Sequence, residues 1–396
     1  MILLLHGDAL EELKKLEDNS VDSIVTDPPY GLKFMGKRWD YDVPSIEVWE
    51  ECLRVLKPGG YLLSFAGTRT QHRMAVNIED AGFEIRDMIA WVYGSGFPKS
   101  HNISKALDKE AGVEREVIGK NLNARKTNGN ISICKKNGSG TITAPATDEA
   151  KQWDGWGTAL KPALEPITVA RKPLSEKTIA KNILKWGTSG INIDGCRIEM
   201  MEKDREEYIS KRKSFENVTG KVHGNIIMNA SPANSPETKI HDSRKGRFPA
   251  NLIHDGSEEV EALFPQNAGA SAPVKGTENS VACEGNITGK RNRVEGTFHN
   301  DSGSAARFFY CAKASKEDRG KGNNHPTVKP TDLMRYLVRL VTPKGGICLD
   351  PYMGSGTTGK GCKLENFSFI GIENVKESFD IAKKRIDAEL YQTVLF

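Results

Sequence analysis

The sequence has few cysteines, and they form no pattern. Its seven cysteines include no C-x-x-C pair and no spacing typical of zinc ligands, so it predicts neither a metal site nor a disulfide framework. Scattered thiols of this kind are typical of a reducing compartment, which favours a cytoplasmic location. No apolar run approaches the roughly 20 residues that a membrane-spanning helix needs, so we expect no membrane contact.

A large charge excess of either sign is also absent. The chain carries 56 Lys and Arg against 52 Asp and Glu, a net charge of +4, which permits an anionic partner without requiring one. The apolar start, residues 1–5, lacks the basic flank of a signal peptide and meets Gly7 and Asp8 at once, so we interpret it as a strand. With 396 residues, the chain is long enough for a large core and two domains.

The first hundred residues alternate between strand and helix patterns. The expected strands are 2–5, 21–26, 61–66 and 85–93, and the expected helices are 9–16, 46–56 and 71–81. Such alternation predicts an α/β fold with a parallel, doubly wound sheet. Pro58-Gly59-Gly60 is expected to end the second helix.

The middle of the chain breaks this alternation. Residues 99–152 hold one short helical stretch and then mainly Asn, Gly, Lys, Ser and Thr, a composition typical of loops or disorder. An apolar run at 166–170 predicts one more core strand. Residues 174–324 are irregular apart from a mixed-charge helix expected at 200–213, and they indicate a loop-rich recognition region on a rigid scaffold.

Regular patterns return after residue 325. Thr331 is expected to cap a helix at 332–341, with an acidic residue in its first turn. The other expected elements are strands at 347–349 and 368–373 and helices at 358–364 and 376–390.

Two motifs stand at the ends of expected strands. The first is Asp27-Pro28-Pro29-Tyr30, directly after the strand at 21–26. Proline has no N–H for a ladder, so two in a row end a strand at once. Asp27 is therefore expected at the carboxyl end of a strand, where open α/β sheets bind ligands.

The second motif is a glycine loop, Asp-Pro-Tyr-Met-Gly-Ser-Gly-Thr-Thr at 350–358. A strand, glycines and a helix bring backbone N–H groups close to a ligand. The motif has three possible interpretations: a structural turn, a P-loop, or a loop that binds an adenosyl cofactor. Residues 354–360 fit G-x-x-x-x-G-K, but Gly361 stands where a P-loop has Ser or Thr for Mg²⁺. The motif at Asp27 favours the adenosyl cofactor.

Together the two motifs resemble those of the S-adenosylmethionine-dependent DNA amino-methyltransferases. Their order, with a variable region between them, is similar to the beta class of that family. The resemblance covers roughly residues 1–98, 153–173 and 325–396. It implies a Rossmann-like methyltransferase sheet, circularly permuted, with an inserted loop-rich target-recognition domain.

The resemblance also implies a division of the chain and a set of site residues. The segments are a catalytic half at 1–98, a loop-rich insertion at 99–152, a returning core strand at 153–173, a target-recognition region at 174–324 and a cofactor-binding half at 325–396. The implied catalytic residues are Asp27, Pro28, Pro29 and Tyr30. The implied cofactor residues are Asp350, Pro351, Tyr352, Gly354, Ser355, Gly356, Thr357 and Thr358 at the methionine end, His325, Thr327, Lys329 and Pro330 over its carboxylate, Glu373 at the ribose and Asp8 beside the adenine.

Some of these residues also have ordinary structural readings. His325 before a proline suits a turn, and Lys329 suits a solvated cation. Asp8 suits the cap of the first helix.

The chemistry explains why an acid is needed at residue 27. An exocyclic amine is a poor nucleophile because its lone pair is delocalised into the base. The Asp27 carboxylate and the Pro28 carbonyl would accept its hydrogens and aim the lone pair at the methyl group. Tyr30 would stack on a base flipped out of double-stranded DNA.

The resemblance implies adenine N6 as the target, because cytosine-N4 enzymes of this family more often carry Ser in place of Asp27. Cytosine-N4 methylation and a catalytically idle DNA-binding protein stay open as alternatives. The resemblance is also compatible with restriction-modification and with a homodimer.

Overall fold

The computed structural model describes residues 1–32, 41–96, 100–120, 141–200, 246–266, 303–313, 318, 323 and 328–389. The chain forms two compact units. The first comprises Met1–Gly94 and Leu164–Phe396, and the second comprises Ser95–Ala163. The proposed division into five segments stays a prediction.

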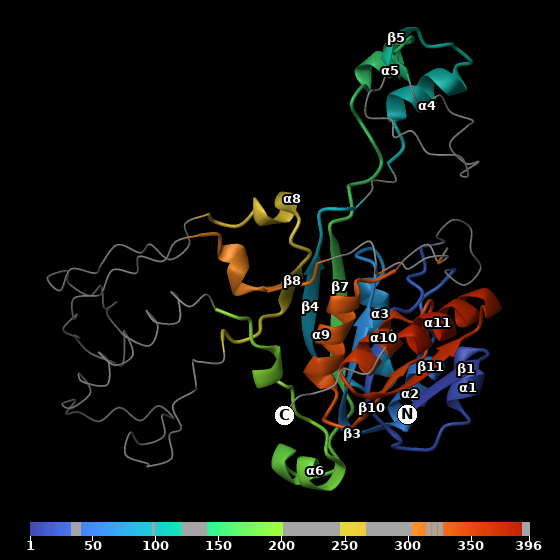
Figure 1. The fold of residues 1–396 in the computed structure, drawn as a ribbon. Coiled ribbons are helices and arrows are strands. Elements are labelled where there is room, and N and C mark those ends of the chain that lie inside the picture. The colour runs from blue at the N-terminus through green and yellow to red at the C-terminus, as the bar shows by residue number, and fades with distance from the viewer. Residues whose placement is uncertain are drawn as a thin grey trace, which may run out of the picture. The chain divides into compact units, whose positions relative to one another are not determined.

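The first unit is built on one large sheet (Figure 1). Its strands are β1 (Ile2–His6), β2 (Val21–Thr26), β3 (Leu56–Phe65), β4 (Glu84–Val92), β7 (Leu164–Arg171), β8 (Leu252–His254), β9 (Tyr310–Cys311), β10 (Ile347–Asp350) and β11 (Ser368–Glu373). Their order across the sheet is β1-β11-β10-β2-β3-β7-β4-β8-β9.

One strand corrects the expectation of a parallel sheet. β7 is antiparallel to both of its neighbours, β3 and β4, whereas the other pairs are parallel. The physical reason is where the chain re-enters. Leu164, the first residue of β7, pairs with Val92, the last residue of β4. The chain therefore re-enters the sheet at the carboxyl end of β4, and β7 must run in the opposite direction to β4.

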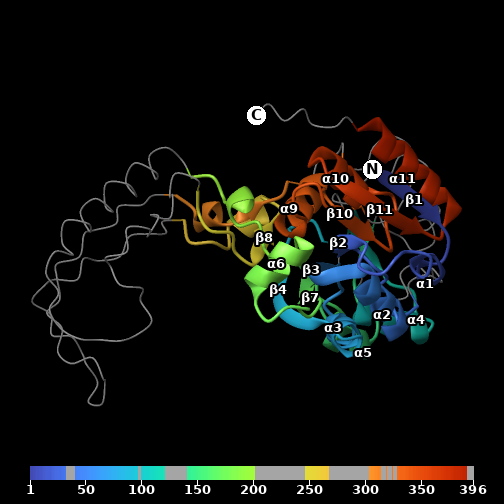
Figure 2. The ribbon, with the colours of Figure 1, turned by 90° about the horizontal axis from the view of Figure 1, so that it is seen from below.

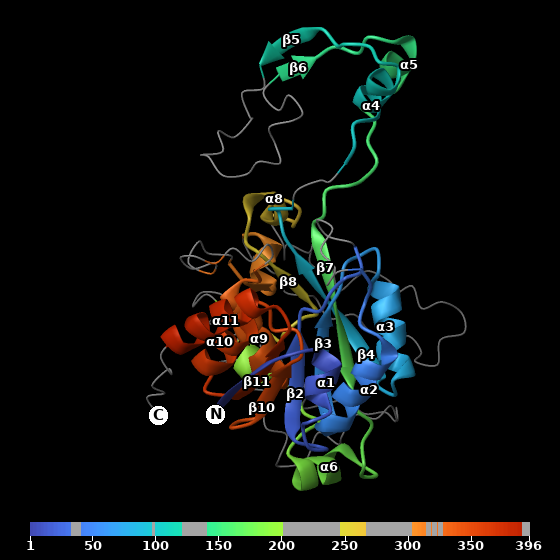
Figure 3. The same cartoon turned by 90° about the vertical axis from the view of Figure 1, so that its right-hand side faces the viewer.

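Helices cover both faces of this sheet, as Figures 2 and 3 show. One face carries α1 (Ala9–Leu13), α2 (Ile46–Val55) and α3 (Gln71–Asp80), and the other carries α9 (Thr331–Val341), α10 (Thr357–Leu364) and α11 (Lys376–Ala388). Each face has its own apolar core. Trp49 and Ile78 lie in the first core, and Tyr336 and Ile386 lie in the second. The α/β fold and its two helical layers are therefore confirmed.

Shorter helical elements complete the described part of this unit. They are α6 (Ile179–Trp186), η3 (Asp194–Cys196), α8 (Glu258–Glu261) and η5 (Ala305–Phe308). The helix expected at 200–213 lies outside the described residues except for its first position.

Pro58-Gly59-Gly60 does not form the expected turn. It lies inside β3, which begins at Leu56 directly after α2. The Pro58 carbonyl accepts hydrogen bonds from Asn182 Nδ2 (2.7 Å) and Thr188 Oγ1 (2.6 Å). A residue of α6 and one that follows this helix thus satisfy the backbone where the proline interrupts the ladder.

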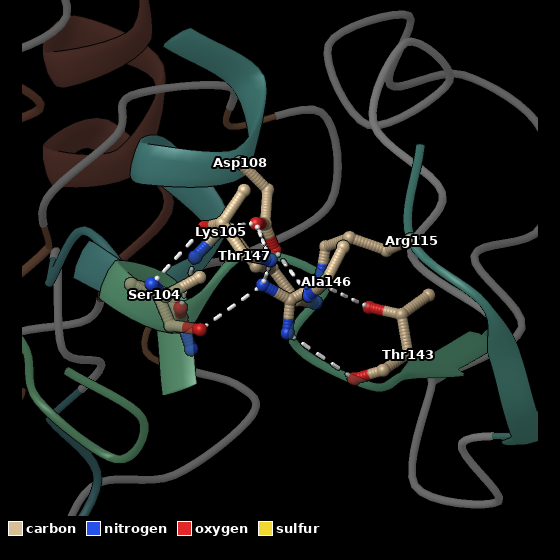
Figure 4. Close-up of polar contacts among 9 residues, drawn as sticks. Ser104, Lys105, Asp108, Arg115, Thr143, Ala146 and Thr147 are labelled. Carbon is tan, nitrogen blue, oxygen red and sulfur yellow. Dashed lines mark hydrogen bonds and ion pairs between the residues drawn. The ribbon is translucent and has the colours of Figure 1, made fainter. Parts of the chain in front are cut away.

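The second unit has more regular structure than its composition predicts. It contains α4 (Ile103–Glu110), a pair of strands, β5 (Val117–Lys120) and β6 (Thr141–Thr143), and α5 (Asp148–Gln152). A buried polar cluster joins them (Figure 4). Asp108 accepts hydrogen bonds from Thr147 N (2.9 Å) and Ala146 N (3.1 Å) and pairs with Arg115 (2.7 Å). Burial opposes ionisation of Asp108, but these donors lower its pKa to about 2.

Within the described ranges, no helix has both the length and the apolar character that crossing a membrane requires. The same residues bring together no group of three or more His, Cys, Asp or Glu suited to a metal ion.

Candidate functional site

The two sequence motifs follow neighbouring strands. β2 and β10 pair in parallel, with Ile24 opposite Leu349, so Asp27 and the glycine loop leave the sheet at the same edge. A buried hydrogen bond of 2.7 Å from Thr26 Oγ1 to Asp350 Oδ1 joins the two strand ends. Residues 324 positions apart thus form one side of a single site.

The buried Asp350 side chain stabilises the glycine loop through hydrogen bonds. It is 1% exposed and also accepts hydrogen bonds from Thr358 Oγ1 (2.6 Å) and Tyr352 N (3.0 Å). Burial raises its pKa to about 6. These contacts give Asp350 and Thr358 a structural role inside the loop, and the ligand contacts that the resemblance implies for them stay a prediction.

The turn of the loop is held by Glu373, at the end of the next strand. Glu373 accepts hydrogen bonds from Gly354 N (3.0 Å) and Val375 N (2.8 Å). Gly354 and Gly356 have φ values of +52° and +82°, a region that favours glycine. Burial raises the pKa of Glu373 to about 7.

α11 packs directly on the same loop. A Cβ at Gly356 would lie 2.9 Å from Cβ of Ala382 in α11, so this glycine serves helix packing. Arg385, also in α11, donates to Ser355 Oγ (2.8 Å) and lies 3.4 Å from Thr357 Oγ1. Arg385 could not be selected from the sequence, because it stands among other charged residues on an amphipathic helix.

Two more residues of the loop lie toward the core, and Asp8 lies at the start of α1. Pro351 is buried, and Tyr352 packs against the core on the α1–α3 face. Asp8 caps α1, accepting hydrogen bonds from Leu10 N (3.0 Å) and Glu11 N (3.3 Å). It also lies beside Glu373, because Gly7 N donates to the Glu373 carbonyl (3.1 Å).

The donor set fits an adenosyl cofactor. Two acids lie at the carboxyl ends of the paired strands β1 and β11: Asp8 shortly after β1, and Glu373 as the last residue of β11. Carboxylates accept hydrogen bonds from ribose hydroxyls and amines. The glycine turn lies against Glu373 and opens α10. Backbone N–H groups at such a helix start suit an anionic group.

A second group of side chains surrounds Asp27. Tyr30 Oη donates to Asp27 Oδ1 (2.6 Å), and Lys329 Nζ donates to Oδ2 (2.5 Å). Glu165, from β7, lies 3.2 Å from Lys329 Nζ and accepts hydrogen bonds from Tyr30 Oη (3.3 Å) and Tyr93 Oη (3.2 Å). We call Asp27, Tyr30, Tyr93, Glu165 and Lys329 the Asp27 cluster.

The Asp27 cluster holds two carboxylates and one ammonium group. Burial disfavours the charged form of Lys329, but the charges of Asp27 and Glu165 outweigh it and raise the lysine pKa. Burial and the same two carboxylates raise the Tyr30 pKa well above its usual value. With Lys329 protonated and Tyr30 neutral, the cluster has a formal charge of −1.

Lys329 has a partner that the resemblance does not imply. The resemblance implies a contact with the cofactor carboxylate, whereas the structure places its ammonium on Asp27, 4.8 Å from the ring centroid of Phe65. Pro330 precedes α9 directly, and Thr331 is the first helical residue rather than the expected cap. His325 and Thr327 lie outside the described residues.

The turn after Asp27 is fixed by the backbone. Pro28 is buried, and the Tyr30 carbonyl accepts a hydrogen bond from Thr70 Oγ1 (2.6 Å).

The sequence analysis did not select Glu165 or Tyr93 as site residues. The available signal is weak: an acid immediately before Pro166, at the entry of an apolar strand.

Known proteins resemble this chain in sequence. The sequence pattern of a family described as DNA methylase, N6_N4_Mtase, matches residues 21–384. The Type II methyltransferase M.BglI of Bacillus subtilis is 36% identical over 398 residues, covering 96% of this chain and 84% of the relative. The DNA adenine methyltransferase YhdJ of Escherichia coli is 38% identical over 99 residues, 23% of this chain and 33% of the relative.

A solved structure is also similar over most of the chain. The crystal structure of the M1.HpyAVI–SAM complex covers 98% of this chain and 100% of its own, at 18% identity and a TM-score of 0.41.

Proposed function

Because the chain belongs to the N6_N4_Mtase family of DNA methylases, we propose that it methylates the N6 amine of adenine in double-stranded DNA. The observation that carries this proposal is the joining of the Asp27 strand end to the glycine-loop strand end through Thr26 and Asp350. One acceptor carboxylate and one cofactor loop therefore share an edge of the sheet.

The methyl donor of this family is S-adenosylmethionine, whose sulfonium supplies an activated methyl group when it is bound. The residues that would hold it are the glycine turn at 354–357, Glu373 and Asp8. Asp350 and Thr358 would act through the loop, because their side chains are buried behind it. The hydrogen bond from Gly354 N to Glu373 would preform the turn before the cofactor arrives.

Asp27 retains room for a substrate amine. A carboxylate has about four lone-pair sites, and Tyr30 and Lys329 each occupy one of them. The amine would donate to Asp27 and to the Pro28 carbonyl, whose direction the proline ring fixes. Asp27 would then take the proton that the methylated nitrogen loses.

The adenine assignment rests on Asp27 and agrees with the name of one relative, the DNA adenine methyltransferase YhdJ. M.BglI is named a Type II methyltransferase, which supports a role beside a restriction enzyme for this chain as well. The homodimer stays a prediction.

The distribution of charge supports DNA as the partner. Residues 95–163 contain eleven Lys and Arg and seven Asp and Glu, an excess equal to the net charge of +4 of the whole chain. The rest of the chain is electrically balanced, so any attraction for phosphates over long distance comes from this unit. Residues 174–324 stay the predicted target-recognition region, and much of that range lies outside the described residues.

Expression in a host that lacks DNA methylases tests the proposal. Nucleosides from its DNA, analysed by mass spectrometry, should contain N6-methyladenine. Asp27→Ala should lower the amount formed per unit time at least a hundredfold, on the order of a general-base contribution. Asp18→Ala is the matched control, since this exposed carboxylate pairs with Arg54 and belongs to neither motif. N4-methylcytosine without N6-methyladenine would overturn the adenine assignment, and full activity of Asp27→Ala would overturn the catalytic one.

A further inference from the structure

Glu165 lies in the Asp27 cluster although it belongs to neither motif. It is contributed by β7, the antiparallel strand between β3 and β4, and its side chain is 22% exposed. Its carboxylate contacts Lys329, Tyr30 and Tyr93 at 3.2–3.3 Å. Two of these groups, Lys329 and Tyr30, also bind Asp27, so Glu165 is tied to the acceptor carboxylate through both.

The reaction gives this second carboxylate a purpose. The amine nitrogen forms a bond to the methyl carbon with its lone pair, the carbon–sulfur bond breaks with its electrons going to sulfur, and an N–H proton passes to Asp27. During this step positive charge moves onto the nitrogen beside Asp27. If Lys329 had Asp27 as its sole carboxylate partner, the two charges would cancel where that positive charge develops.

Glu165 changes this balance. The Lys329 ammonium lies between the carboxylates of Glu165 and Asp27, so the cluster keeps a formal charge of −1. The electrostatic potential at Asp27 is therefore more negative than it would be with Lys329 and Asp27 alone. Glu165 also offers Lys329 a second carboxylate, 3.2 Å away, when the substrate amine takes up hydrogen-bonding capacity of Asp27. In the partly buried site such charges interact more strongly than in water.

We propose that Glu165 is a positioning residue for methyl transfer, which shares Lys329 with Asp27 and so keeps the acceptor carboxylate available to the amine. This inference rests on the proposed function. It assigns a role in catalysis to a residue that lies outside both sequence motifs.

Glu165→Gln is the informative variant, because glutamine has the same shape and can still accept hydrogen bonds from the tyrosine hydroxyls. Methylation is measured under single turnover with unmethylated chromosomal DNA from a methylase-deficient host and radiolabelled S-adenosylmethionine. The rate should fall ten- to a hundredfold, and a tenfold change equals about 1.4 kcal/mol. The dissociation constants for S-adenosylmethionine and DNA and the melting temperature should match those of the wild type.

Two controls separate this role from a structural one. Glu176→Gln removes a carboxylate of similar exposure, 27%, that pairs with Lys185 on the surface, and it should leave the rate unchanged. In a Lys329→Met background the additional effect of Glu165→Gln should shrink to less than threefold, because the shared ammonium is gone.

The outcomes are distinct for each hypothesis. A wild-type protein that methylates no base in DNA would contradict the proposed function. A wild-type protein that methylates DNA, with Glu165→Gln within twofold of its rate, would overturn the inference. So would a loss of rate that is matched by weaker binding or lower stability, and so would full additivity with Lys329→Met.

Discussion

Glu373 provides a quantitative test of the cofactor side of the site. Burial raises its pKa from 4.5 to about 7, although Val375 N and Gly354 N stabilise the ionised form. The folded protein therefore binds this proton more tightly than the unfolded chain does. The resulting stability is fully present below pH 4.5 and is lost as the pH rises through 7.

The size of this loss follows from the two pKa values. Between pH 5 and pH 8, a carboxyl group with these values lowers the free energy of unfolding by about 2.5 kcal/mol. Glu373→Gln removes the titration, since glutamine is neutral throughout. Between pH 5 and pH 8, the decrease in the free energy of unfolding should therefore be about 2.5 kcal/mol smaller for the variant than for the wild type.

Urea denaturation of the protein without cofactor, at pH 5 and pH 8, measures the difference. Titrating groups that do not interact with Glu373 contribute equally in both proteins and cancel, whereas the charge of Asp350 acts on Glu373 and is part of the difference. Glu50→Gln, an exposed position, should keep the pH dependence of the wild type. If Glu373→Gln shows the same pH dependence as the wild type, burial does not raise the pKa of Glu373 and the account of the loop is wrong.

Two further perturbations test the packing of the loop and the integrity of the second unit. Gly356→Ala should lower the free energy of unfolding by about 3 kcal/mol, because the new Cβ would lie 2.9 Å from Ala382 and the backbone has a positive φ. Gly345 also has a positive φ, +76°, but open space around it. Gly345→Ala should therefore lower the free energy of unfolding by only about 1–2 kcal/mol in the same urea titration. Asp108→Ala leaves the Arg115 guanidinium without its buried carboxylate, so limited proteolysis should cut first within 95–163; a cleavage pattern identical to that of the wild type would contradict this.

The regular part of the fold could be predicted from periodicity. The helices at Ile46–Val55, Gln71–Asp80 and Thr331–Val341 lie within two residues of their expected positions, because each presents one apolar face to a core. The direction of β7 could not be predicted. It depends on where the chain returns after residue 163, and an apolar strand has the same composition in either direction.

The second unit was underestimated for a related reason. Its order depends on a polar cluster around Asp108 and Arg115 more than on an apolar run, and composition reveals apolar runs best. Sequence reasoning likewise missed Glu165, because its significance comes from Lys329, which is 164 positions away in the chain and 3.2 Å away in space.

The acids at the carboxyl edge of the sheet show why position alone does not define a catalytic residue. Asp27 and Asp350 follow adjacent parallel strands, and both stand in motifs that the resemblance assigns to the site. The two acids differ in how deeply they are buried. The Asp350 side chain is enclosed and satisfied by three donors from its own protein, so an incoming amine would have to displace a structural hydrogen bond. The Asp27 side chain remains 24% exposed and accepts two hydrogen bonds from side chains in the described ranges, so it can accept a new donor without loss of the fold. We therefore propose that the acid that performs chemistry at this edge is Asp27, whose carboxylate the described residues leave incompletely satisfied.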